Sequence, residues 1–220
     1  MRVIVFTKFP RPGLVKTRLA RSIGFDHAAA LQAAFLRDEL DMLAGLNAAV
    51  TLCCDPVVPL REYMDLLGRG FCYTEQCGAD LGQRMICTMN AALEDGPALL
   101  IGSDLPDLPR TSIAEAWEML DHASVCLGPT PDGGFHLLGL RRPLPQEVFA
   151  GVRWGAPDVL ARSLGNFSAL GIGPRLLPSW PDVDTHMDLL DYARRNQDSS
   201  AHTMVYIREH NLVQNFGISS

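Results

Sequence analysis

An uninterrupted apolar run, residues 98–101, ends abruptly in the sequence Gly-Ser-Asp-Leu-Pro. Four apolar residues in a row are typical of a strand that is buried on both faces of a parallel sheet. Because Gly, Ser, Asp and Pro extend such a strand poorly, the Asp104 carboxylate follows directly after its carboxyl end, where open α/β sheets bind their ligands. A simpler interpretation makes Asp104 a turn residue that bonds its own backbone. Residues 98–106 alone favour the turn interpretation of Asp104. Other motifs in the chain are needed to support a ligand-binding role.

Strand and helix patterns alternate through the first two thirds of the chain. We expect strands at residues 2–6, 48–54, 71–73, 97–102, 124–128, 135–140 and 175–177. We expect helices at residues 14–21, from 26 onward, and at 60–67, 80–93, 112–120, 157–164, 185–195 and 201–210. Three helix starts carry cap signals, which are Asp26, the pair Ser112 and Glu115, and Asp184 or Thr185 with Asp188. The alternation predicts an α/β fold, a three-layer α/β/α sandwich around a mostly parallel central sheet.

Length and charge limit the classes of protein. The chain has 220 residues, 47% of them hydrophobic, and a net charge of −6 without a basic block. These values fit one domain, residues 1–220, and exclude the electrostatic footprint of a nucleic-acid-binding protein. The apolar start is too short for a signal peptide, and no apolar run reaches the length of a membrane span. We therefore expect a cytoplasmic protein.

The tail and the cysteines carry no readable chemistry. Residues 197–220 are expected to form a C-terminal helical extension, which packs either on its own domain or on a second copy in a homodimer. The six cysteines form no C-x-x-C pair, and no histidine stands at zinc-finger spacing. We interpret them as reduced thiols that pack as small apolar side chains. His136 in the expected strand 135–140 is likewise interpreted as a packed side chain.

A basic loop follows the first strand. Residues 8–18 contain six residues suited to an anion, which are Lys8, Arg11, Gly13, Lys16, Thr17 and Arg18. Gly13 lets the backbone approach a ligand closely, and the following helix start offers free N–H groups. Cations gathered there would supply the counter-charge of a diphosphate. The Walker sequence is absent, and spacing alone does not separate a phosphate loop from a solvated basic loop.

Carboxylates appear at three further turns. Asp104 and Asp107 follow the central strand, and Asp182 and Asp184 precede the helix expected at 185–195. Carboxylates together with substrate phosphates are the ligands that Mg²⁺ or Mn²⁺ prefers at nucleotide sites. Asp132 lies in the Gly- and Pro-rich turn 128–134, which is either a plain turn or the place of a carboxylate that orients an acceptor or acts as base.

Five motifs in a fixed order resemble one known family. They occupy residues 6–19, 80–85, 101–106, 128–134 and 182–185. Together they are similar to the rSAM/selenodomain-associated transferase 1 family, over roughly residues 1–195. The resemblance implies the nucleotide-diphospho-sugar transferase fold, also called GT-A and Rossmann-like. It is shared more distantly with the phospholactate guanylyltransferases.

The resemblance also implies roles for individual residues. The side chains expected at the nucleotide are Lys8, Gly13, Lys16, Arg18, Asp80, Arg84 and Ser103. Asp104 and Asp184 would hold Mg²⁺ or Mn²⁺. Lys16 and Arg18 would stabilise the departing phosphate, and Asp132 would position or deprotonate the acceptor.

Three functions agree with this sequence. The first is a metal-dependent transfer of a sugar from a nucleotide-sugar donor to a small-molecule acceptor. The second is a nucleotidyl transfer, in which an acceptor phosphate attacks the α-phosphorus of a nucleoside triphosphate and pyrophosphate leaves. The third is a nucleotide-binding module without catalysis. Product formation separates the three.

Overall fold

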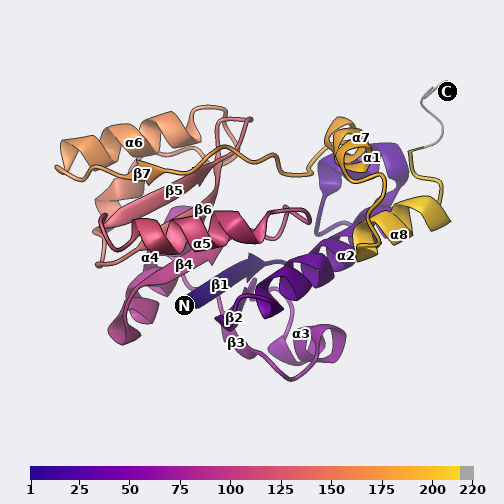
Figure 1. Ribbon diagram of the computed structural model, residues 1–220, viewed down its shortest axis with the longest axis horizontal. Coiled ribbons are helices and arrows are strands. Elements are labelled where there is room, and N and C mark those ends of the chain that lie inside the picture. Colours follow the sequence, from indigo (N-terminus) through magenta and orange to yellow (C-terminus); the bar gives the residue numbers. More distant parts are fainter. Residues whose placement is uncertain (214–220) are drawn as a thin grey trace.

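A single seven-stranded sheet organises the chain in the computed structural model, which describes residues 1–213 (Figure 1). Its order is β3-β2-β1-β4-β6-β5-β7. The strands are β1 (Arg2–Thr7), β2 (Ala49–Cys54), β3 (Cys72–Glu75), β4 (Ala98–Ile101), β5 (Val125–Pro129), β6 (Phe135–Leu140) and β7 (Arg175–Leu176). All seven expected strands are present, with bounds that differ by two residues or fewer at each end.

One strand runs against the others. The pairs β2–β3, β1–β2, β1–β4 and β5–β7 are parallel, whereas β6 pairs antiparallel with both β4 and β5. The five-residue connection between β5 and β6 explains this, because a link that short joins only antiparallel neighbours. The mostly parallel sheet is therefore confirmed, but the neighbours of β4 are one parallel and one antiparallel strand rather than two parallel ones.

Helices connect the strands and cover both faces of the sheet. They are α1 (Thr17–Ile23), α2 (Phe25–Ala44), α3 (Leu60–Leu67), α4 (Leu81–Ala92), α5 (Arg110–Met119), α6 (Val159–Ala169), α7 (His186–Arg195) and α8 (His202–Glu209), with the short 3₁₀ turns η1 (Leu93–Asp95) and η2 (Gln146–Phe149). No helix within residues 1–213 is long and apolar enough to cross a membrane.

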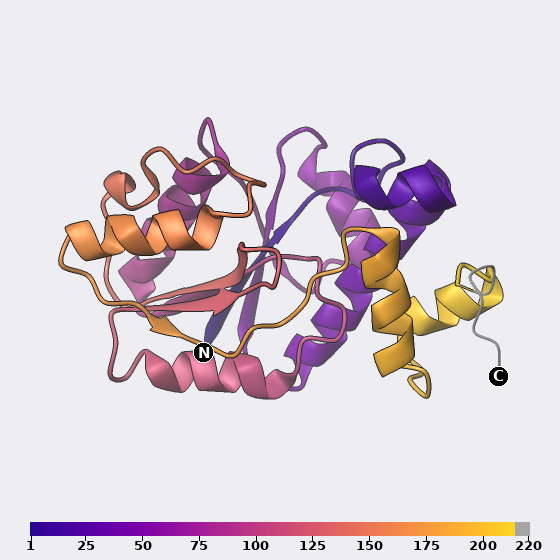
Figure 2. The ribbon, with the colours of Figure 1, turned by 90° about the horizontal axis from the view of Figure 1, so that it is seen from above.

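Strand alternation divides the core into two layers. Val3 and Leu99 point to the face that α2, α3 and α5 cover, and their neighbours Ile4 and Leu100 point to the face of α4, η2 and α6. Because successive strand side chains point to opposite faces, each central strand contributes to both layers. Figure 2 shows the strands between α5 on one side and α4 with α6 on the other. The three-layer prediction is confirmed.

A third apolar cluster lies beside the sheet rather than against it. It joins α1, α2, α7 and α8 through buried side chains that include Leu19, Phe35 and Tyr192. The Asp38 carboxylate of α2 accepts hydrogen bonds from the backbone N–H groups of His202 (2.7 Å) and Thr203 (2.9 Å) at the start of α8. The described part of the expected extension 197–220 thus packs on its own chain, and residues 214–220 lie outside the described residues.

Two expected helix caps are wrong, and the helix expected from residue 14 begins at Thr17. Gly24, not Asp26, is the N-cap of α2, because one residue ends α1 and begins α2 with a φ of +88°, which glycine adopts freely. Helix α5 begins at Arg110 behind Pro109, so Ser112 and Glu115 lie inside its first turns and form no capping box. The box at Thr185 and Asp188 is confirmed.

Candidate active site

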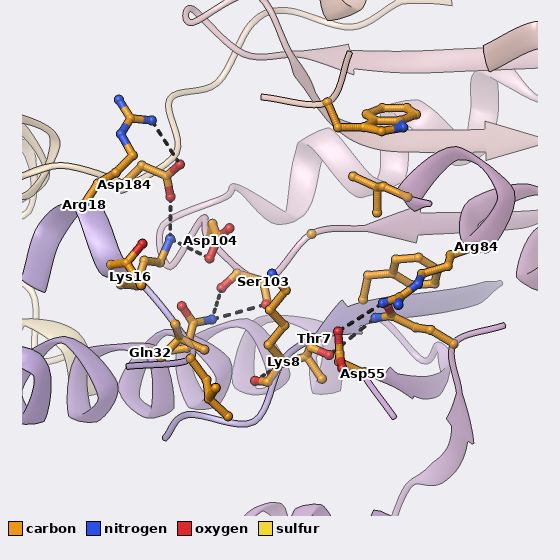
Figure 3. Close-up of a pocket in the computed structure, with 18 of the residues that line it drawn as sticks. Thr7, Lys8, Lys16, Arg18, Gln32, Asp55, Arg84, Ser103, Asp104 and Asp184 are labelled. Atoms are coloured by element: carbon orange, nitrogen blue, oxygen red, sulfur yellow. Dashed lines mark hydrogen bonds and ion pairs between the residues drawn. The ribbon is translucent and has the colours of Figure 1, made fainter. Parts of the chain in front are cut away.

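A cavity of about 770 Å³ opens at the carboxyl edge of β1, β2 and β4 (Figure 3). Because these strands are parallel neighbours, the residues that follow each of them meet at this edge. The loop after β1, the start of α4 and the segment before α7 complete the walls. Eight of the predicted site residues line it, which are Lys8, Lys16, Arg18, Asp80, Arg84, Ser103, Asp104 and Asp184.

A buried ammonium stands at one end of this cavity between two carboxylates. Lys16 Nζ lies 2.5 Å from Asp104 Oδ1 and 2.9 Å from Asp184 Oδ1, and only 3% of the Lys16 side chain is exposed. Burial alone would lower the pKa of Lys16, but the two carboxylates outweigh burial and hold that pKa above its usual value. Lys16 therefore stays charged, and its charge is directed at the carboxylates.

The Asp184 carboxylate also meets a second cation. Arg18 Nη1 lies 3.7 Å from Asp184 Oδ2, and the Arg18 side chain is 63% exposed to the cavity and to solvent. Burial alone would raise the pKa of Asp184, but Lys16, then Arg18 and Lys8, hold it below its usual value. Nearby Asp182 has its pKa raised to about 7, first by burial and then by the charges of Asp184 and Asp132.

The backbone at Lys16 has an unusual conformation. Lys16 is the N-cap of α1 with φ 47° and ψ 39°, the left-handed region that non-glycine residues rarely adopt. Its stem passes beside Phe35 of α2, with Nζ 5.4 Å from the ring centroid. A residue other than glycine keeps such a conformation only where the surrounding structure fixes it.

Helix α2 fixes the backbone on both sides of Asp104. Gln32 Nε2 donates to the carbonyl oxygen of Ser103 (2.7 Å) and to its hydroxyl (3.2 Å). Glu39, two turns along the helix, accepts from the backbone N–H of Leu105 through Oε1 (3.0 Å). Both side chains are at least 97% buried. Burial raises the pKa of Glu39 well above its usual value, and its Oε2 has no hydrogen-bond partner within residues 1–213.

An arginine network forms the opposite end of the cavity. Arg84 Nη1 contacts Asp55 Oδ2 (3.0 Å) and Gln76 Oε1 (3.2 Å), and Arg84 Nε donates to the carbonyl of Gly78 (3.2 Å). Asp80 is the N-cap of α4, and its side chain accepts from the backbone N–H of Gln83 (2.9 Å). These contacts rigidify the wall formed by the ends of β2 and β3 and the start of α4.

Four of these residues escaped the sequence interpretation. Asp55 and Gln76 directly follow β2 and β3, so the logic that identified Asp104 at the end of β4 would have found them. Gln32 and Glu39 carried only the weak signal of polar residues on the apolar side of a helix.

Five residues considered in the sequence lie outside the cavity lining, which are Arg11, Gly13, Asp107, Asp132 and Asp182. Gly13 occupies the exposed loop with φ +83°. Asp132 is exposed and folds back on its own turn, where it accepts from Thr130 Oγ1 (2.5 Å) and from the backbone N–H of Gly134 (3.0 Å). Asp107 pairs with Arg195 in a structural contact that ties β4 to the end of α7.

The two carboxylates fit a divalent cation in chemistry but not as a complete cage. Oxygen atoms of Asp104 and Asp184 point at one position, and carboxylate oxygens are what Mg²⁺ and Mn²⁺ prefer. Within residues 1–213, no group of three or more His, Cys, Asp or Glu side chains is arranged to hold a metal ion. An ion would therefore need further ligands from water and substrate phosphates, and it would have to replace the Lys16 ammonium.

Comparison with known proteins supports the fold and the family. Residues 23–156 match the family described as "Uncharacterized protein conserved in bacteria" (DUF2064). A crystal structure from Desulfovibrio desulfuricans G20, of a "putative nucleotide-diphospho-sugar transferase", is 35% identical and superposes with a TM-score of 0.91, covering 98% of this chain and 97% of that one. No curated protein matches the chain.

More distant structures share the fold. A cytidylyltransferase from Leptospira borgpetersenii serovar Hardjo-bovis is 11% identical, with a TM-score of 0.57 over 99% of this chain and 98% of that one. The CMP:2-keto-3-deoxy-manno-octonic acid synthetase in complex with CTP is 12% identical, with a TM-score of 0.54 over 90% of this chain and 98% of that one. The chain thus has the fold of nucleotide-diphospho-sugar transferases and cytidylyltransferases.

Proposed function

Because the chain belongs to the DUF2064 family and has this fold, we propose that it is a transferase that uses a nucleotide-activated donor. The observation that carries the proposal is the Lys16–Asp104–Asp184 cluster beside Arg18 in a cavity at the carboxyl edge of the sheet. We also propose that the chain is related to the rSAM/selenodomain-associated transferases, because its residues 6–19 resemble their motif. A cytoplasmic location is part of the same proposal.

The first version is glycosyl transfer with Mg²⁺ or Mn²⁺. Asp104 and Asp184 would hold the ion, which supplies positive charge to the donor phosphates. Lys8 and Arg18 bind the diphosphate. Lys16 also binds it when Asp104 and Asp184 hold the metal ion. The bond between the sugar's anomeric carbon and the diphosphate oxygen breaks, and the acceptor oxygen takes its place. Asp132 positions that oxygen or removes its proton once a substrate bridges the space between cavity and turn.

The second version is nucleotidyl transfer, which is favoured by the contacts of the carboxylates in the cavity. Each carboxylate that lines the described cavity already has a partner, since Asp55, Asp104 and Asp184 are ion-paired and Asp80 caps α4. A reaction that needs no protein base suits this lining. An acceptor phosphate is already anionic, so it attacks the α-phosphorus of a nucleoside triphosphate directly and pyrophosphate leaves.

Product analysis separates these versions from a non-catalytic module. The protein is incubated with Mn²⁺ and small-molecule acceptors, together with nucleoside triphosphates or nucleotide sugars. We expect release of a nucleoside diphosphate from one nucleotide sugar. Pyrophosphate release would instead support nucleotidyl transfer, and tight nucleotide binding without any turnover would refute both enzymatic versions.

One carboxylate substitution tests the location of the site. Asp104→Asn removes a charge that faces Lys16 and the proposed ion, so we expect metal-dependent nucleotide binding, measured by calorimetry, to be lost. Asp65→Asn on α3 is the control, because the Asp65 side chain is 68% exposed and is not part of the cavity lining. Unchanged binding by the Asp104 variant would place the site elsewhere.

A further inference from the structure

The Lys16 ammonium stands where a divalent ion would bind Asp104 and Asp184. We propose that Lys16 is an internal counter-ion, which blocks this carboxylate pair to free divalent cations and yields it only when the ion arrives together with nucleotide phosphates. The inference rests on the proposed function, since it takes the pair as the metal position of a nucleotide site.

The geometry makes the two occupants mutually exclusive. One Oδ1 atom of each carboxylate lies within 2.9 Å of Lys16 Nζ, so both are aimed at the same point. A Mg²⁺ ion bound to both oxygens would need that point at about 2.1 Å from each. An ammonium and a divalent ion cannot share it, because their positive charges repel strongly at contact distance in a buried place.

The conformation and the position of Lys16 both suit an exchange of its carboxylate partners for phosphate. Its left-handed backbone is a strained conformation for a residue other than glycine. The lysine side chain is a compact charge on a flexible stem, which suits a change of partner. Lys16 lines the same cavity as Lys8 and Arg18, so phosphates bound there offer Lys16 a new anionic partner in the same cavity.

Charge balance explains why phosphate is needed. Lys16 and Arg18 already neutralise Asp104 and Asp184, so a free divalent ion would add two uncompensated charges. A diphosphate brings the negative charge that allows Lys16 and the ion to be present together. The pair is therefore expected to bind metal and nucleotide cooperatively.

Mn²⁺ titration without nucleotide tests the inference. Free Mn²⁺ is followed by electron paramagnetic resonance for the wild type, Lys16→Met and Lys8→Met. Lys8 is the matched control, because it lines the same cavity but makes no contact with Asp104 or Asp184 within salt-bridge distance in the described structure. We expect Lys16→Met to bind Mn²⁺ at least about tenfold more tightly than the wild type, and Lys8→Met to stay within about twofold. Equal affinity of Lys16→Met and the wild type would overturn the inference, and so would an equal gain in both variants.

A second measurement uses the unsubstituted protein. Lys8 and Lys16 are the two lysines of the sequence, so protein labelled with ¹³C at the lysine ε position gives two signals. We expect the Lys16 signal to stay in place with Mg²⁺ alone and to move with Mg²⁺ plus a nucleoside diphosphate. Movement with Mg²⁺ alone would overturn the inference.

These outcomes are independent of turnover. If Lys16→Met tightens Mn²⁺ binding but no nucleotide is turned over, the counter-ion role holds and the enzymatic proposal fails. If turnover occurs but the Lys16 variant and the Lys16 signal do not respond as expected, the enzymatic proposal holds and the counter-ion role fails.

Discussion

Replacing His136 by leucine is expected to protect the protein against unfolding in mild acid. His136 lies on β6 with 6% of its surface exposed, and neither ring nitrogen has a hydrogen-bond partner among the described residues 1–213. Burial lowers its pKa from 6.5 to about 4. Below pH 6.5 the unfolded chain binds a proton at this position that the folded protein does not, so acid favours the unfolded chain.

The magnitude follows from the two pKa values. Above pH 6.5 the lowered pKa of His136 costs the folded protein no stability. As the pH drops from 6.5 to about 4, the free energy of unfolding falls because only the unfolded chain takes up this proton. At about 1.4 kcal/mol per pH unit, the loss over this window is about 3 kcal/mol. Leucine has a similar volume and no proton to bind, so Leu in place of His136 removes this loss. The raised pKa values of Glu39 and Asp182 are common to both proteins and cancel in the comparison.

Urea unfolding followed by tryptophan fluorescence at pH 7.5, 6, 5 and 4 measures the effect. The free energy of unfolding of His136→Leu minus that of the wild type should rise by about 3 kcal/mol from pH 7.5 to pH 4. His122→Leu, at an exposed position after α5, is the control and should show no such rise. A difference that stays constant with pH would refute the interpretation of His136 as a buried neutral histidine.

Three further substitutions probe the supports of the site. Glu39→Gln retains an acceptor for the N–H of Leu105 and should keep nucleotide affinity. Glu39→Ala should lose about 1–3 kcal/mol of stability in urea unfolding and should bind nucleotide more weakly. Equal behaviour of the two variants would contradict a role of Glu39 in holding the Asp104 backbone. Thr185→Ala removes the capping box of α7 and should cost about 1 kcal/mol, seen as a lower melting temperature. Arg84→Gln should reduce nucleotide affinity in calorimetry. Arg69→Gln, at an 80% exposed position, is the control and should leave that affinity unchanged. Unchanged affinity of the Arg84 variant would show that the arginine network is not part of the nucleotide-binding surface.

Local patterns were sufficient for the strands and for one end of the site. Residues 98–101 are buried on both faces of the sheet, and Asp104 lines the cavity just after them. Both could be predicted because the apolar run and the Gly-Ser-Asp-Leu-Pro segment that ends it determine structure over only a few residues. The capping box at Thr185 was predictable for the same reason, since both of its partners lie within one helical turn.

Long-range contacts account for what the sequence did not reveal. The basic loop was interpreted as a phosphate ligand, yet the Lys16 ammonium lies between carboxylates from β4 and from the segment before α7, which only the folded chain brings together. The antiparallel direction of β6 depends on the length of the preceding turn and on which strand edge remained open beside β4. The turn carboxylate Asp132 looked equivalent to Asp104 in sequence, but its turn closes on itself outside the cavity lining.

The contact between Lys16 and Asp184 spans 168 positions of the chain, and this has a consequence for synthesis on the ribosome. Chains are made from the N-terminus, so β1, β2 and β4 can assemble while residue 184 is still to be translated. A nascent chain at that stage carries Lys16 opposite the single carboxylate of Asp104. The cluster is completed only when the segment before α7 emerges and docks beside α1. Competence to bind a ligand therefore arrives late, after the parallel part of the sheet is already built.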